Sequence, residues 1–73
     1  MSERIYDEIE EKVRREKPEL CDRGSRYYPV DFYHEVFRRA DEMYRNGQVT
    51  EDVRRIAFEQ YRETCEMYKW TVG

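Results

Sequence analysis

The chain has few of the residues that cross-link small proteins or bind metal ions. Its 73 residues include two cysteines, Cys21 and Cys65, and a single histidine, His34. Zinc sites generally use close-spaced pairs of ligands, and this sequence has none, so we expect no metal site. We also expect both thiols to be reduced, because no secretion signal is visible; one disulfide between them is the alternative.

Long apolar runs are absent, and Gly and Pro are scarce. No stretch approaches the ~20 apolar residues that cross a bilayer, and no cationic start leads into the apolar segment of a signal peptide. We therefore expect a soluble, cytoplasmic protein that does not bind membranes. With three Gly and two Pro, and with periodic apolar positions, an ordered fold is expected rather than a disordered chain.

Candidate nucleophiles and histidine are also scarce. Neither serine stands in a nucleophile turn, since Ser2 is a candidate helix cap and Ser25 lies in a loop. Cys65 and His34 could act as nucleophile and base only if the fold brought them into contact. A chain of this length leaves little room for a concave pocket. We expect no enzymatic activity and no cofactor.

Charged and aromatic residues are what the chain has in excess. Charged residues make up 42% of it and aromatic residues 15%, with seven Tyr. A chain this short buries only about 60% of its surface on folding. We therefore expect some aromatic rings on the surface beside Arg, as in protein contact surfaces. The net charge of −3 argues against general affinity for nucleic acid or anionic membranes.

Apolar periodicity predicts an all-α fold, a small three-helix bundle that forms one domain over residues 1–73. Helices are expected over residues 3–17, 31–45 and 51–69, and the last two form an antiparallel hairpin. The irregular loop over 18–30 can include a short helical turn at 18–22. Phe58 and Cys65 are predicted to form a second flank of the third helix. The expected core residues are Ile5, Ile9 and Val13, extended by Tyr6 and Leu20; Phe32, Val36, Ala40 and either Met43 or Tyr44, with Tyr33 and Phe37 beside them; and Val53, Ile56, Ala57, Tyr61, Thr64 and Tyr68.

Local signals set the ends of these helices. Pro18 disfavours helical geometry at the residue before it and so ends the first helix. Asp31 is the predicted cap of the second helix, which ends at the pair Asn46 and Gly47 because this pair readily adopts positive φ. Thr50 is the predicted cap of the third helix.

Opposite charges four residues apart occur along all three helices. Each such pair stabilises its helix by ~0.2–0.5 kcal/mol, and together they account for most of the charge as a solvated surface. The pairs are Glu10–Arg14, Glu11–Arg15, Glu35–Arg39, Asp41–Arg45, Glu51–Arg55, Arg55–Glu59 and Arg62–Glu66.

These features favour a non-enzymatic protein-interaction module, of accessory or inhibitor type, that binds a protein partner and forms a homodimer. A dimer would enlarge a small core and cover surplus aromatic rings. In size and composition the chain resembles small accessory proteins of phages, viruses and plasmids, a likeness of class and not of motif. In a competing interpretation, Tyr27 and Tyr28 close the loop over the bundle with their rings inward. The candidate contact residues are Arg23, Arg26, Tyr27, Tyr28, Tyr33, Phe58 and Trp70.

The alternative function is that of a small DNA-binding regulator, similar to a helix-turn-helix protein, that uses the third helix. Two details argue against it. Met43 stands four residues before the turn glycine, where a small residue is expected, and the third helix begins with Glu51 and Asp52, which would face phosphates and base acceptors. The candidate nucleic-acid-binding residues are Arg38, Arg39, Arg54 and Arg55.

Overall fold

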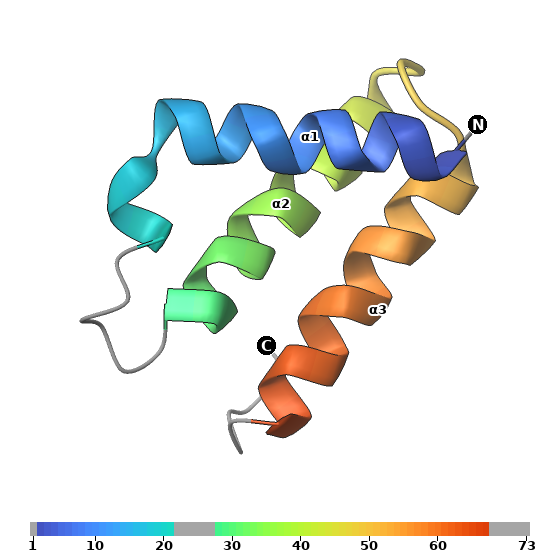
Figure 1. Cartoon of the computed structure of the whole chain (residues 1–73). Coiled ribbons are helices and arrows are strands. Elements are labelled where there is room, and N and C mark those ends of the chain that lie inside the picture. The colour runs from blue at the N-terminus through green and yellow to red at the C-terminus, as the bar shows by residue number, and fades with distance from the viewer. Residues whose placement is uncertain (1, 22–27, 68–73) are drawn as a thin grey trace.

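The described part of the chain folds into three α-helices and one short 3-10 helix. A computed structural model describes residues 2–21 and 28–67. In these ranges the elements are α1 (Ser2–Glu16), η1 (Pro18–Cys21), α2 (Tyr28–Arg45) and α3 (Glu51–Met67), and there is no strand. Helices α2 and α3 form an antiparallel hairpin, and α1 packs across both of them (Figure 1). The predicted all-α three-helix bundle is confirmed.

The end of α1 follows the proline signal. The Lys17 backbone N–H donates the last helical hydrogen bond to the Val13 carbonyl at 2.8 Å, and α1 ends at Glu16. The chain then turns into η1, where the Leu20 N–H donates to the Lys17 carbonyl at 3.1 Å. Pro18 lies at the start of that turn, so the predicted break and the short helical turn after it are both confirmed.

Helix α2 begins at Tyr28, three residues before the predicted start at residue 31. Pro29 lies in the first turn, where a backbone N–H has no helical acceptor and the fixed φ of proline suits the helix. Asp31 also lies in the first turn, where its carboxylate complements the helix dipole instead of capping the helix. The predicted loop over residues 18–30 is therefore too long, because Pro18–Cys21 form η1 and residues 28–30 belong to the first turn of α2.

The turn between α2 and α3 has the geometry of a Schellman motif. The Gln48 N–H donates to the Met43 carbonyl at 2.8 Å, and the Gly47 N–H donates to the Tyr44 carbonyl at 3.0 Å. Gly47 has a φ of 75°, the left-handed conformation that the motif requires after the last helical residues. Thr50 then accepts a backbone hydrogen bond from Arg54 at 3.5 Å, and α3 begins at Glu51 as predicted.

The core lies where the three helices meet, and it contains most of the predicted apolar positions. Met43 packs against it, whereas Tyr44 is 38% exposed, which settles the predicted choice between them. Ile5, Leu20 and Ile56 are partly buried at its edge. Tyr68 lies outside the described residues. The buried hydrophobic residues are Tyr6, Ile9, Val13, Val30, Phe32, Val36, Ala40, Val53, Ala57, Tyr61 and Cys65.

Phe58 and Cys65 lie seven residues apart on one flank of α3, as predicted, but the two side chains differ in burial. The Cys65 side chain is completely buried as a free thiol and packs with Val30 and Tyr61 in a second cluster at the other end of the hairpin. Val30 reaches this position because α2 starts earlier than predicted. Phe58, in contrast, is 38% exposed.

Tyr6 is a core residue whose side chain carries a buried hydroxyl group. Its hydroxyl is buried, and among the described residues it has no hydrogen-bond partner. Burial raises the pKa of the Tyr6 hydroxyl well above its usual range, and the neighbouring Glu10 carboxylate raises that pKa further. A buried hydroxyl without a partner costs free energy that the same ring without the hydroxyl would not.

Tyr6→Phe is therefore expected to raise the free energy of unfolding by up to ~1 kcal/mol, since the ring stays and the unpaired hydroxyl is removed. Urea denaturation followed by circular dichroism measures the change. Tyr44→Phe is the matched control, because the same atom is removed from an exposed ring, and its stability should stay unchanged. A clear loss of stability in Tyr6→Phe would show that the hydroxyl is hydrogen-bonded in solution.

Candidate functional site

The predicted contact residues fall into three groups in the structure. Arg23, Arg26, Tyr27 and Trp70 lie outside the described residues, and Tyr28 is described only as the first residue of α2. Tyr33 is partly buried: it packs against the core and meets the Phe32 ring edge-on, with ring centroids 5.1 Å apart. Phe58 is exposed.

The exposed Phe58 ring packs against a partly buried aromatic neighbour. Its centroid lies 5.3 Å from that of Phe37 on α2, with the two rings tilted by 57°. Phe37 in turn stacks on Tyr61, with an angle of 10° between the rings and centroids 6.1 Å apart. This row of three rings runs from the core to the surface between α2 and α3. Phe58 is thus an apolar group with a fixed orientation, and it would lose little conformational freedom on binding.

Arg54 is fixed beside it by two contacts to α2. Its Nε donates a hydrogen bond to Asp41 Oδ1 at 2.8 Å, which is a charge-assisted contact between the two helices. Its guanidinium carbon lies 5.5 Å from the centroid of the Tyr44 ring, within range of a cation–π interaction. Asp41 also binds Arg45 at 3.1 Å, so one carboxylate orients two arginines along this edge of the hairpin.

We call the surface formed by Tyr44, Arg54, Arg55 and Phe58 the aromatic–arginine patch. A groove of about 290 Å³ runs through it, lined by Phe37, Glu51, Arg54, Arg55 and Phe58. Phe58 and Tyr44 are each 38% exposed. Aromatic rings beside arginine are the residues that carry most of the binding energy in protein interfaces. The sequence placed Phe58 and the two arginines in separate hypotheses, and only the packing of α3 on α2 joins them.

Arg38 and Arg39 lie on another side of α2, around a buried carboxylate. Glu35 is 7% exposed and accepts hydrogen bonds from Arg38 Nε at 3.1 Å, Arg38 Nη2 at 2.9 Å and Arg39 Nε at 2.9 Å. Lys17 Nζ lies 3.6 Å from the same carboxylate, and Arg39 Nη1 also binds Glu16 Oε1 at 2.6 Å. The hydrogen bonds from Arg38, and then those from Arg39, lower the pKa of Glu35 to about 2.

The two arginine pairs do not form one basic surface. Arg38 and Arg39 line a groove of about 490 Å³ between α1 and α2, whereas Arg54 and Arg55 line the groove between α2 and α3. All four guanidinium groups lie within 4.0 Å of a carboxylate oxygen. Contact with phosphates would have to compete with these carboxylates, so the geometry disfavours the nucleic-acid hypothesis.

His34 and Cys65 both lie near Tyr61 in the described part of the chain. The His34 ring lies on Tyr61, with centroids 5.3 Å apart, while the Cys65 thiol is completely buried. Within residues 2–21 and 28–67, no group of three or more His, Cys, Asp or Glu is arranged to hold a metal ion. No helix in those ranges is both long and apolar enough to cross a membrane.

Comparison with known protein families, with characterised proteins and with solved structures gives no match.

Proposed function

We propose that this chain is a non-enzymatic protein-interaction module that associates with itself and binds or modulates a larger protein. The observation that carries this proposal is the exposed Phe58 ring, which is held by Phe37 and flanked by Arg54 and Arg55. An exposed ring on a rigid support is the kind of anchor that buries well in a partner's pocket. The surrounding arginines supply the polar rim that such anchors need.

The charge of this surface favours a protein over a nucleic acid as the partner. Arg54 is already paired with Asp41, and Glu51 lines the same groove, so the patch carries both signs of charge. The chain as a whole has a net charge of −3. A phosphate backbone binds surfaces with a net positive charge, whereas a protein surface can match mixed charges one by one.

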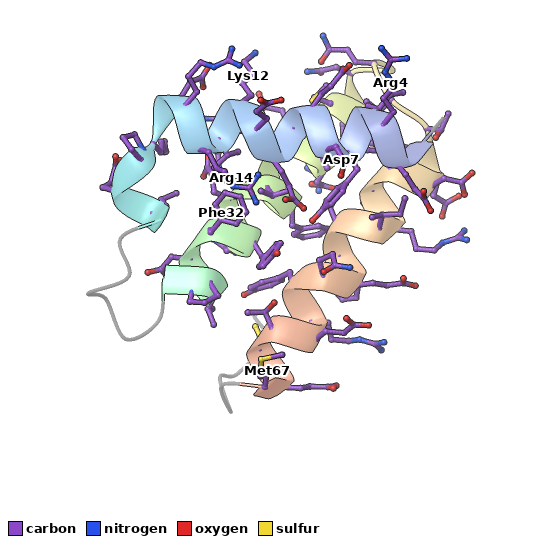
Figure 2. The ribbon with its side chains drawn as sticks, in the orientation of Figure 1. Arg4, Asp7, Lys12, Arg14, Phe32 and Met67 are labelled. Atoms are coloured by element: carbon purple, nitrogen blue, oxygen red, sulfur yellow. The ribbon has the colours of Figure 1, made fainter. Side chains whose placement is uncertain are left out.

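Phe58→Ala is expected to weaken association at least ~10-fold, because truncating an interface anchor commonly costs 2 kcal/mol or more. Its effect on stability should be small, since the ring is exposed. Self-association is measured by sedimentation velocity, and binding to other proteins by affinity capture from an extract of the source cells. Met67→Ala is the control: Met67 is 75% exposed at the far end of α3 (Figure 2), and its loss should change neither measurement.

Two results together would overturn the proposed function. The intact protein would not self-associate, and every protein that it captures would also be captured by Phe58→Ala. Binding that Phe58→Ala leaves unchanged would also remove the aromatic–arginine patch as its basis.

A further inference from the structure

We propose that a second copy of this chain covers the aromatic–arginine patch, with the two α3 helices packed antiparallel about a two-fold axis. This inference rests on the proposed function. It specifies that the partner is a second copy of the chain and how the two α3 helices are aligned.

The exposed face of α3 has the spacing of a helix-packing seam. Four exposed residues follow one another along it at intervals of four, three and four: Glu51, Arg55, Phe58 and Arg62. This spacing places them in one stripe along the helix. Arg55 is 61% exposed at its side chain and Phe58 is 38% exposed. The opposite face, with Val53 and Ala57, is completely buried in the core.

An antiparallel two-fold arrangement matches this stripe to itself. When Arg55 of one copy faces the Phe58 ring of the other, the same register places Glu51 opposite Arg62. Arginine over an aromatic ring is a favourable cation–π pair, and the pair of Glu51 with Arg62 joins opposite charges. Each pair occurs twice because the interface is isologous.

A parallel two-fold arrangement gives the opposite result. It would place Glu51 against Glu51, Arg55 against Arg55 and Arg62 against Arg62, so like charges would repel at three of the four positions of the stripe. The antiparallel register also uses two charges that are unpaired inside one copy. The predicted pairs of Glu51 with Arg55 and of Arg62 with Glu66 do not form: within the described ranges neither Glu51 nor Arg62 lies in an ion pair within 4.0 Å. Complementarity between these two charges therefore favours a second copy in the antiparallel direction.

Charge exchange between positions 51 and 62 tests this register. Glu51→Arg should place Arg against Arg62 of the partner copy, and Arg62→Glu should place Glu against Glu51. Each single variant is expected to weaken dimerisation at least ~10-fold at low salt, because two like-charged pairs are created. The double variant Glu51→Arg/Arg62→Glu restores opposite charges and should recover the affinity to within ~3-fold.

Recovery in the double variant can only arise between copies. The two positions are separated by about 16 Å along one helix, too far for a direct ion pair within the same copy. Sedimentation velocity over a range of concentrations measures each dimerisation constant, and circular dichroism confirms that each variant is folded. If Glu51→Arg destabilises the start of α3, Glu51→Gln and Arg62→Gln can be used instead. Each removes the attraction between positions 51 and 62 without creating a like-charged pair. Glu63→Arg is the control, since Glu63 is exposed about 100° around the helix from Arg62.

Weakening by both single variants and recovery in the double variant would support the proposed dimer. A dimer that ignores the exchanges, or one that the double variant fails to restore, would overturn this arrangement while self-association through another face remained. A protein that stays monomeric at every concentration would overturn the dimer itself. In that case the proposed function still stands or falls separately, on whether Phe58→Ala changes the capture of another protein.

Discussion

Phe32→Ala is expected to leave most of the protein unfolded at room temperature. Phe32 is 4% exposed and lies between α1 and α2, where the Arg14 guanidinium carbon stands 5.0 Å from the centroid of its ring (Figure 2). Truncating a buried phenylalanine to alanine removes ~3–5 kcal/mol of stability. A single core of this size supplies a total of only about 3–5 kcal/mol, so this one change removes most of it.

The far-ultraviolet circular dichroism signal and its urea dependence measure this loss. Phe58→Ala is a matched control at a protein concentration at which the chain is monomeric. The same atoms are removed from a ring that is 38% exposed, so its loss of stability should be much smaller than that of Phe32→Ala. Phe32→Leu keeps much of the buried volume and should fold with a loss of about 1–2 kcal/mol. A cooperative transition for Phe32→Ala near that of the unchanged protein would show that Phe32 is not part of the core.

Helix type and core positions were predictable because they depend on periodicity within single segments. The stripe of Ile9 and Val13 on α1 and that of Val36 and Ala40 on α2 follow from a repeat of 3.6 residues alone. The start of α2 was not predictable in the same way. Pro29 is compatible both with a loop and with the first turn of a helix, and only the packing of Val30 on Cys65 favours the helix.

The candidate site depends on contacts that no local spacing contains. The four-residue pairs Glu10–Arg14, Glu35–Arg39 and Asp41–Arg45 were predicted and are confirmed. The contact of Arg54 with Asp41 joins residues on different helices, so it depends on how α2 and α3 pack.

The exposure of Tyr44 also depends on how the helices pack. Tyr44 lies next to Met43 on α2, and the helical repeat allows either side chain to face the core. The hairpin turns Met43 inward and leaves Tyr44 at the surface, where it flanks Arg54. The sequence therefore presented this one of the four patch residues only as an alternative to Met43 in the core.

Glu35→Gln is expected to lower the free energy of unfolding by about 2 kcal/mol at neutral pH. Glu35 is 7% exposed and links Arg38 and Arg39 on α2 with Lys17 after α1, so its charge holds three cations together. Glutamine keeps the shape of the side chain and one acceptor but removes the negative charge. The effect is smaller than the pKa shift alone would give, because the Arg38 side chain is 53% exposed and water screens its interaction.

The pH dependence of stability separates this charge from the packing of the side chain. The pKa of Glu35 is lowered from 4.5 in the unfolded chain to about 2 in the fold, chiefly by hydrogen bonds from Arg38 and Arg39. A carboxyl with a lowered pKa stabilises the fold fully above about pH 4.5 and loses that contribution as the pH falls toward 2. Urea denaturation across this window should show a steeper loss of stability in the unchanged protein than in Glu35→Gln.

Glu42→Gln is the control for this measurement. Glu42 lies 3.7 Å from Arg38 as well, but its side chain is 66% exposed, so removing its charge should leave the pH profile nearly unchanged. If the stability of Glu35→Gln fell with the same slope as that of the unchanged protein, the carboxylate would not be held in its charged form by the arginines. If the stabilities of the unchanged protein and Glu35→Gln instead converge as the pH falls toward 2, their difference at neutral pH is due to the charge of Glu35. The ionised carboxylate is present only in the unchanged protein, and it is lost by protonation at low pH.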